Sequence, residues 1–323
     1  MGSGKYNAAA IATSFVFVFL FCMSCNAQLS TSFYDQTCPD LQSTVKTQVR
    51  TSISAERRMA AGSLIRLHFH DCFVQGCDAS ILLDDSPTIQ SEKSAPPNKN
   101  SVRGYDVIDR AKTAVEKICP GIVSCADILS IAARDATVLA GGPSWTVKLG
   151  RRESTTTNFA QASNGLPFFR DNLQKLIDDF ANKGFTIREM VALSGAHSFG
   201  QAQCFTFRDR IYNNASDIDA GFASTRRRGC PSSGGDSKLA PLDLVTSTSF
   251  DNNYYKNIMQ KKGLLETDQI LLSGGSTDDI VRDYSKNPAT FKSDFAAAMA
   301  KMSDLSPLTG QSGVIRRICS SLT

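Results

Sequence analysis

Apolar residues recur at intervals of three and four along most of the chain, the spacing that places side chains on one face of an α-helix. Residues 107–118 show this best, because their six apolar residues fall on a single stripe. The alternating pattern of a half-buried strand is scarce. The sequence therefore predicts a mainly α-helical fold. Helical spacing covers residues 41–59, 107–118, 125–139, 169–183, 250–261 and 277–303.

Glycine and proline indicate where these helices end. Gly-Gly-Pro at residues 141–143 would stop the helix that begins at residue 125, and Gly184 would close the next one. Thr186 and Glu189 have the spacing of a capping box, which predicts a further helix start. The intervening polar stretches predict long functional loops at residues 72–104, 141–168 and 213–249.

The first 27 residues have the pattern of a secretory signal peptide. Lys5 is their only charged residue, an apolar run follows, and small residues lead up to Ala27. The run is too short for a comfortable membrane span, although an uncleaved anchor is the alternative. We expect residues 1–27 to be removed before Gln28, leaving a mature chain with no membrane contact.

Cysteine usage agrees with export. The chain has ten cysteines, and two of them lie in the segment expected to be removed. An even number in an exported chain predicts disulfides, but the sequence alone does not choose their pairing. The mature chain has no C-x-x-C pair, which disfavours a cysteine zinc site. The eight remaining cysteines are Cys38, Cys72, Cys77, Cys119, Cys125, Cys204, Cys230 and Cys319.

The formal net charge of +4 is too small to indicate a nucleic-acid partner. The basic run at residues 226–228 is typical of a solvated loop, and contact with an acidic polysaccharide is the alternative. Asn214 begins the only N-x-[ST] sequence and is a predicted glycosylation site.

The chain has only three histidines, His68, His70 and His197. On a helix, Arg66, Phe69 and His70 share one face, and His68 points about 200° away from His70. A base beside a permanent cation suits the cleavage of a peroxide O–O bond. The histidine takes a proton and returns it to the leaving oxygen, while the arginine stabilises negative charge.

Other interpretations of these histidines stay open on the residues alone. As a strand, residues 66–70 would place His68 and His70 on one face, where together with His197 they could hold zinc. Arg66 would then point towards the cation, which is unfavourable. His197 follows Gly195 and Ala196, small neighbours that let a flat macrocycle approach, and a haem iron needs such an axial imidazole. Ordinary core histidines are the third interpretation.

Ordered motifs along essentially the whole mature chain resemble the plant secretory (class III) haem peroxidases. The resemblance implies an all-α haem peroxidase fold over residues 28–323, with two helical halves that sandwich one haem b. It also implies reduction of hydrogen peroxide and one-electron oxidation of small phenolic donors through compounds I and II. The motifs are FYxxTCP at 33–39, RLHFHDCFVQGCDASILLD at 66–84, VSCADI at 123–128, GGPSW at 141–145, VALSGAHSFG at 191–200 and FDNNYY at 250–255.

The resemblance implies a role for each residue on the catalytic side of the haem. His70 would be the acid–base catalyst, Arg66 the charge stabiliser and Phe69 a wall of the pocket. Asn98 would accept the other imidazole N–H of His70, and Glu92 would orient Asn98.

On the opposite side, His197 would bind the iron and Asp268 would bind the far nitrogen of His197, giving the ligand imidazolate character. By itself Asp268 carries no sequence signal. The carbonyl of Pro167 would accept from phenolic donors. Phe168 and Phe169 would either flank such a donor or anchor the next helix.

Two calcium ions and the disulfide pairing are also implied by the resemblance. We also expect a monomer and, since the chain stops four residues after Cys319, a location outside the cell. A secreted non-enzymatic calcium-binding wall protein on the same scaffold and a zinc hydrolase are the alternative functions. The first calcium ion would be bound by Asp71, Val74, Gly76, Asp78 and Ser80. The second would be bound by Ser198, Asp243, Thr246, Ser249 and Asp251. The implied disulfides are Cys38–Cys119, Cys72–Cys77, Cys125–Cys319 and Cys204–Cys230.

Overall fold

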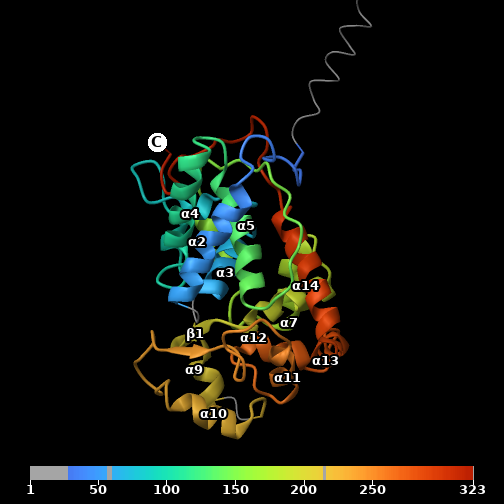
Figure 1. The fold of residues 1–323 in the computed structure, drawn as a ribbon. Coiled ribbons are helices and arrows are strands. Elements are labelled where there is room, and N and C mark those ends of the chain that lie inside the picture. The colour runs from blue at the N-terminus through green and yellow to red at the C-terminus, as the bar shows by residue number, and fades with distance from the viewer. Residues whose placement is uncertain (1–27, 57–59, 214–215, 323) are drawn as a thin grey trace, which may run out of the picture.

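The structure is a computed structural model that describes residues 28–56, 60–213 and 216–322. Helices dominate it, so the predicted mainly α-helical fold is confirmed (Figure 1). Two short strands, β1 (Gln201–Gln203) and β2 (Leu239–Pro241), pair antiparallel, with Gln201 opposite Pro241. The predicted signal peptide and Asn214 lie outside the described residues.

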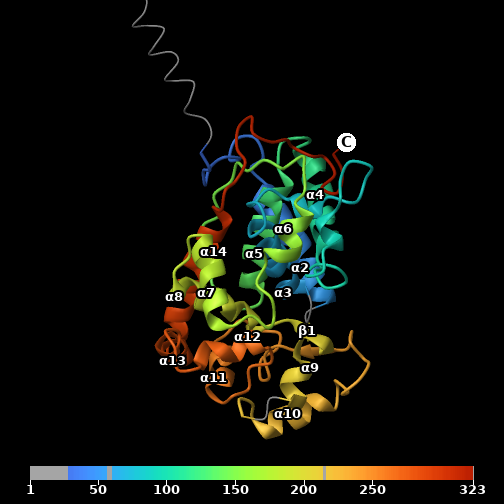
Figure 2. The same ribbon diagram turned by 180° about the vertical axis from the view of Figure 1, so that it is seen from behind.

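The N-terminal half of the molecule is a bundle built around α5. Residues 125–133 of that helix are all buried, and the hydroxyl of Ser124 caps it by accepting from the backbone N–H of Asp127 at 3.0 Å. Three other helices pack in the same half (Figures 1 and 2). The bundle consists of α2 (Leu41–Ala55), α3 (Ala60–Cys72), α4 (Tyr105–Ile118) and α5 (Cys125–Leu139).

Helices α9, α10 and α11 occupy the opposite end of the molecule in both views (Figures 1 and 2). Helix α14 runs along one side, where it packs against α8 and contacts α3, and so connects the two halves. None of the helices in the described part of the chain has the length and apolar character needed to cross a bilayer. The remaining helices are α6 (Phe159–Asn164), α7 (Leu173–Asn182), α8 (Ile187–Ser194), α9 (Cys204–Asn213), α10 (Ala220–Arg227), α11 (Asn253–Met259), α12 (Glu266–Gln269), α13 (Asp278–Lys286) and α14 (Pro288–Ser303).

Several predicted boundaries differ from the structure. The helix predicted over 277–303 is two helices, because Pro288 cannot continue α13 and instead starts α14. The helix predicted from residue 41 ends at Ala55. The three predicted loops contain α6, α10 and β2, and the single-turn helices η1 (Ser80–Leu82) and η2 (Glu92–Ser94). The capping box is confirmed, since Thr186 and Glu189 each accept from the other's backbone N–H.

All four disulfides form in the pairing that the resemblance implied. The longest ring ties α5 to the C-terminal segment across 194 residues, and the shortest closes the turn after α3. In the chain-entropy model the long ring stabilises the fold by about 5 kcal/mol and the short one by about 2 kcal/mol. The bonds are Cys38–Cys119, Cys72–Cys77, Cys125–Cys319 and Cys204–Cys230.

Candidate active site

Helix α3 brings Arg66 and His70 together on one face. Arg66 Nε lies 3.1 Å from His70 Nε2, the contact expected for residues four apart on a helix. His68 points the other way and is completely buried, with Nε2 3.0 Å from the hydroxyl of Ser303 in α14. The strand interpretation, with His68 and His70 sharing one metal ion, is therefore wrong.

The partners of His70 fix the position of its proton. Its Nδ1 lies 2.6 Å from Asn98 Oδ1. An amide oxygen only accepts, so Nδ1 carries the hydrogen and Nε2 keeps a lone pair. Asn98 Nδ2 donates to the backbone carbonyl of Glu92 at 2.8 Å, which sets the direction of the amide. Glu92 thus orients Asn98 through its main chain, while its carboxylate accepts from the backbone N–H of Asn158.

Burial and the neighbouring Arg66 lower the pKa of His70 well below its usual value, and the hydrogen bond that His70 donates to Asn98 opposes this shift. Arg66 is anchored through its other two nitrogens, which donate to Ser101 Oγ at 2.6 Å and to the carbonyl of Pro97 at 3.0 Å. Burial lowers the pKa of Arg66 to about 10, so it stays cationic at neutral pH. The site therefore holds a neutral base beside a fixed positive charge.

Phe69 lies beside the His70 ring, with the ring centroids 5.6 Å apart. It packs in turn on Phe73 at 4.2 Å and on Phe180 of α7 at 6.2 Å. These aromatic contacts hold Phe69 in place, as expected for an apolar wall.

His197 comes from the short helix η3 (Gly195–Ser198), which directly continues α8. A Cβ at position 195 would overlap the ring of Phe291 and the hydroxyl of Tyr255, so only glycine fits there. The start of α3 packs on the segment that follows His197, because Gly62 meets Gly200 and Phe199. Helix α3 is therefore in contact with the segment that directly follows η3.

The partner of His197 is a carboxylate. His197 Nδ1 lies 2.7 Å from Asp268 Oδ1, and its side chain is 38 % exposed, with no hydrogen-bond partner for Nε2 among the described residues. Asp268 is buried and accepts two further hydrogen bonds, from the Tyr254 hydroxyl at 3.1 Å and the backbone N–H of Leu265 at 2.9 Å. Burial and Asp268 raise the pKa of Tyr254 well above its usual value, so the phenol keeps its proton.

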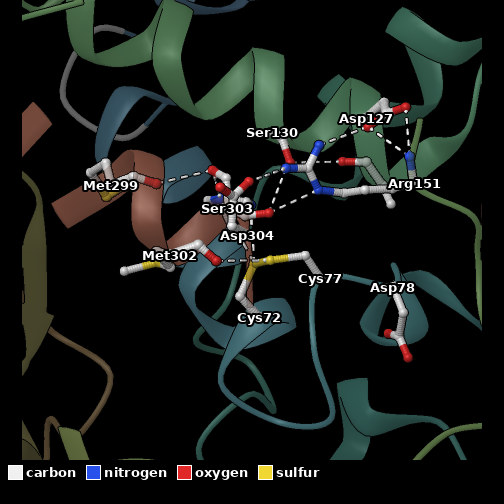
Figure 3. The surroundings of a disulfide bond; sticks show 12 residues. Cys72, Cys77, Asp78, Asp127, Ser130, Arg151, Met299, Met302, Ser303 and Asp304 are labelled. Atoms are coloured by element: carbon white, nitrogen blue, oxygen red, sulfur yellow. Dashed lines mark hydrogen bonds and ion pairs between the residues drawn. A yellow bond between two sulfur atoms is a disulfide. The ribbon is translucent and has the colours of Figure 1, made fainter. Parts of the chain in front are cut away.

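The third histidine belongs to a buried polar cluster at the end of α14. Figure 3 shows Arg151 with Asp127, which lies 2.8 Å away as a fully buried ion pair, and with Ser303. Ser303 is also the partner of His68, whose pKa falls to about 3 through burial and the charge of Arg151.

This cluster provides no zinc site. Within the described ranges, one group of histidine, cysteine and acidic side chains is close enough to share an ion, and it consists of His68, Cys72 and Cys77. The two sulfur atoms of that group form a disulfide, seen at the centre of Figure 3. A disulfide has no thiolate to offer a metal, so His68 serves as a neutral core residue.

Comparison with known proteins agrees with this geometry. The family model described as "Peroxidase" matches residues 45–287. The chain belongs to the peroxidase family. It is 64 % identical over 322 residues to the "Lignin-forming anionic peroxidase" of Nicotiana sylvestris, with 100 % of both chains covered. It is 63 % identical over 298 residues to "Peroxidase 5" of Arabidopsis thaliana, covering 92 % of each. It is 58 % identical over 297 residues to "Basic peroxidase" of Zinnia elegans, covering 92 % of this chain and 91 % of the relative. The resemblance to plant class III peroxidases is thereby confirmed.

In this peroxidase, the residues expected to bind the first calcium ion gather directly after His70. Asp71 is buried, and its Oδ1 has no hydrogen-bond partner among the described residues. Asp78 Oδ1 accepts from the backbone N–H of Ser80 at 2.9 Å. Burial and the nearby Asp78 raise the pKa of Asp71 well above its usual value. Two buried carboxylates that repel each other are a setting in which a bound cation would be favourable.

The two backbone ligands expected for the same ion already accept hydrogen bonds. The carbonyl of Val74 accepts from Lys183 Nζ at 3.1 Å, and the carbonyl of Gly76 accepts from the backbone N–H of Asp78 at 2.9 Å. Each carbonyl has a second lone pair for an ion. Gly76 has φ +122° and packs against the carbonyl of Ser306, a position that only glycine fills without strain.

The residues expected around the second ion lie next to His197. Ser198 is buried, and its Oγ has no partner among the described residues. Asp243 accepts from the backbone N–H of Thr246 at 2.7 Å, and burial and Asp251 raise its pKa. The carbonyl of Thr246 accepts from the backbone N–H of Ser249 at 2.9 Å. The structure thus brings this set into one neighbourhood, with all four carboxylate oxygens of Asp243 and Asp251 already hydrogen-bonded.

Pro167 is half-buried and precedes a row of aromatic rings. Phe168 is 49 % exposed and lies 4.1 Å from the Phe169 ring, and Phe205 of α9 lies 5.6 Å from Phe169. The ring of Phe168 is therefore partly open to solvent, while its backbone is hydrogen-bonded to Asp171 at the turn before α7.

Sequence reasoning from patterns did not single out Ser101 and Tyr254. Each contributes one hydroxyl, and an isolated hydroxyl in a loop or on a helix leaves no periodic signal. Tyr254 lies inside the FDNNYY motif, but its contact with Asp268 depends on the packing of α11 against α12.

Proposed function

We propose that this protein is a secreted haem peroxidase that reduces hydrogen peroxide and oxidises small phenolic donors in one-electron steps. The observation that carries the proposal is a pair of histidines whose Nδ1 partners differ in charge, one neutral and one a carboxylate. His70 has a neutral amide on Nδ1 and an available lone pair on Nε2, whereas His197 has a carboxylate on Nδ1. The intact set of Arg66, His70 and His197 argues against the non-enzymatic wall protein.

The residues present fit a haem b. His197 Nε2 has no hydrogen-bond partner among the residues that the structure describes and belongs to a half-exposed ring, so it would be the iron ligand. Ala196 is a small neighbour beside His197, whereas the space at Gly195 is filled by Phe291 and Tyr255, and Phe69 offers an apolar surface. When bound, the haem supplies a redox-active iron at which peroxide is reduced.

The residues of the chain handle the proton. His70 Nε2 is unprotonated, so it accepts a proton from hydrogen peroxide and then gives it to the departing oxygen. A protonated Nε2 no longer accepts from Arg66 Nε, which frees that N–H for the negative charge developing on the departing oxygen. Ser101 and the carbonyl of Pro97 hold the guanidinium in place throughout.

Asp268 acts on the other histidine. By accepting from Nδ1 it draws the proton away from the ring and makes Nε2 a stronger electron donor to the iron. This favours the more oxidised states of the metal, which peroxide chemistry requires.

Two calcium ions would stabilise the elements that hold the histidines. Asp71 follows His70 and Ser198 follows His197, and each carries a buried oxygen with no hydrogen-bond partner in the described part of the chain, which suits an oxygen-ligated cation. The first ion would use Asp71, Val74, Gly76, Asp78 and Ser80, and the second Ser198, Asp243, Thr246, Ser249 and Asp251.

The electron donor would be a small phenol that binds at the surface of the protein. The carbonyl of Pro167 would accept its hydroxyl, beside the exposed ring of Phe168. The name of the Nicotiana sylvestris relative, a lignin-forming peroxidase, supports a phenolic donor because lignin is a phenolic polymer. Removal of residues 1–27, a glycan on Asn214, a monomeric state and a place in the cell wall complete the proposal.

The stoichiometry of the purified holoenzyme tests it. We expect two molecules of guaiacol to be oxidised for each hydrogen peroxide consumed, and elemental analysis to find two calcium ions per chain. A haem-loaded protein that consumes no peroxide in the presence of guaiacol would overturn the enzymatic assignment. A calcium content near zero in active enzyme would remove the two ions from it.

A further inference from the structure

Tyr254 of α11 directs its hydroxyl at the same carboxylate oxygen that binds His197. Asp268 Oδ1 lies 2.7 Å from His197 Nδ1 and 3.1 Å from the Tyr254 hydroxyl. Asp268 Oδ2 is engaged separately by the backbone N–H of Leu265. Tyr254 is 3 % exposed, so water does not compete for this bond.

The direction of the Tyr254 bond is fixed by its chemistry. An ionised carboxylate has no hydrogen, so the phenol donates and Asp268 accepts. Two donors then share the charge of one oxygen. A carboxylate oxygen that already accepts a charge-assisted bond attracts the second donor less strongly. The phenol therefore weakens the pull of Asp268 on the Nδ1–H of His197.

We propose that Tyr254 is a positioning residue that limits the imidazolate character of His197 and so sets the reduction potential of the iron. This rests on the proposed function, since it requires His197 to bind the iron of a haem. The ring of Tyr254 also meets the His197 imidazole edge to face, with centroids 6.2 Å apart and planes at 86°, which restrains its rotation.

Removal of the hydroxyl in Tyr254→Phe gives a change of defined sign. Asp268 Oδ1 then has one donor fewer and holds the Nδ1–H more strongly. His197 Nε2 becomes richer in electrons and stabilises ferric over ferrous iron. One hydrogen bond corresponds to a change on the order of fivefold in the equilibrium constant for one-electron reduction. The potential of the variant should move to more negative values.

The neighbouring tyrosine provides a matched control. Tyr255 is fully buried in the same helix, and its hydroxyl donates to the carbonyl of Val191 at 2.8 Å. Tyr255→Phe also removes a hydrogen bond from a buried tyrosine hydroxyl, in this case to a backbone carbonyl, and leaves the carboxylate of Asp268 untouched. It should lower thermal stability without changing the potential.

The experiment is a spectroelectrochemical titration of the Fe(III)/Fe(II) couple in the wild-type holoenzyme and both variants. Resonance Raman spectra of the ferrous proteins add the iron–histidine stretch. We expect a negative shift in potential and a higher stretching frequency in Tyr254→Phe alone. An unchanged potential, a positive shift, or an equal shift in Tyr255→Phe overturns the proposal.

A second substitution keeps the test valid if Tyr254→Phe does not fold. 3,5-Difluorotyrosine at position 254 keeps the hydroxyl and the shape of the ring but is a stronger donor, so it should shift the potential in the positive direction. A shift in the negative direction, or none, overturns the proposal. The wild-type spectrum separates the two claims, because a protein without haem contradicts the proposed function, whereas normal haem with no effect of residue 254 contradicts only the role of Tyr254.

Discussion

His70 and His197 have almost the same distance from Nδ1 to the partner oxygen, but the two partners differ in charge. His70 Nδ1 lies 2.6 Å from the amide oxygen of Asn98, and His197 Nδ1 lies 2.7 Å from the carboxylate of Asp268. An amide fixes the tautomer without adding charge, so His70 remains an ordinary neutral base. A carboxylate adds a negative charge and makes the imidazole a strong metal ligand. In the proposed function, the chain therefore obtains two roles from one residue type by exchanging one partner group.

The surroundings reinforce this difference. His70 is 5 % exposed and lies beside the Arg66 cation, which opposes its protonation. The His197 side chain is 38 % exposed, and its Nε2 has no hydrogen-bond partner within residues 28–56, 60–213 and 216–322. His68 has neither an amide nor a carboxylate partner. It is buried against the hydroxyl of Ser303 near the charge of Arg151, and its pKa falls to about 3.

Removal of the base should have the largest effect. His70→Leu deletes general acid–base catalysis, so the rate constant for reaction with hydrogen peroxide should fall by about 10²–10⁴ while haem content is kept. Stopped-flow spectroscopy measures it. His68→Gln changes another buried histidine of α3 and should keep the rate of the folded enzyme. A near-wild-type rate in His70→Leu would show that the base is misassigned.

The next test replaces the carboxylate beside His197 with an amide, the kind of partner that His70 has. Asp268→Asn keeps the shape but removes the charge, and the loss of an outer partner typically costs about 10–100-fold in activity. The iron should also become easier to reduce. Turnover with guaiacol and the reduction potential are the measurements. A variant that keeps both at wild-type values would show that the carboxylate charge is irrelevant.

The reciprocal change should act through pH. Asn98→Asp places a negative charge beside His70 Nδ1, which favours the protonated ring and raises the pKa of that histidine. The base is then lost at a higher pH than in the wild type. The peroxide reaction at pH 5 should slow severalfold, whereas the two proteins should react similarly at pH 8. An equal effect at both pH values would indicate a structural defect.

Removal of calcium should lower the stability of the fold, since the two ions would bind next to His70 and next to His197. Chelation leaves the buried pair Asp71 and Asp78 uncompensated, and we expect the unfolding midpoint to fall by roughly 10 °C, as for two moderately tight ions. Differential scanning calorimetry before and after chelation, with calcium added back, measures this. An unchanged midpoint would remove the structural role of the ions.

The helices were predictable where periodicity is strong and caps are clear, as at residues 107–118 and at Thr186. Helix α10 was missed because only three of its eight residues are buried, which leaves no clear apolar stripe, so tertiary packing stabilises it. The split at Pro288 was overlooked because the apolar pattern continues on both sides of it.

In the candidate site, too, some contacts were predictable from the sequence pattern and others were not. Helical spacing alone places Arg66 beside His70, since the two are four residues apart. Asp268 lies 71 residues from His197, and only the fold brings them together, so the family resemblance was needed to locate it. The contacts of Ser101 and Tyr254 depend on packing, and no pattern in the sequence indicates them.

The central claim is that a haem iron lies between His197, which binds it, and His70, which does not. The absorption spectrum of the purified protein tests this most directly. The account predicts a strong Soret band whose position changes when hydrogen peroxide is added and returns when guaiacol is supplied. A colourless protein that contains zinc or no metal would contradict it.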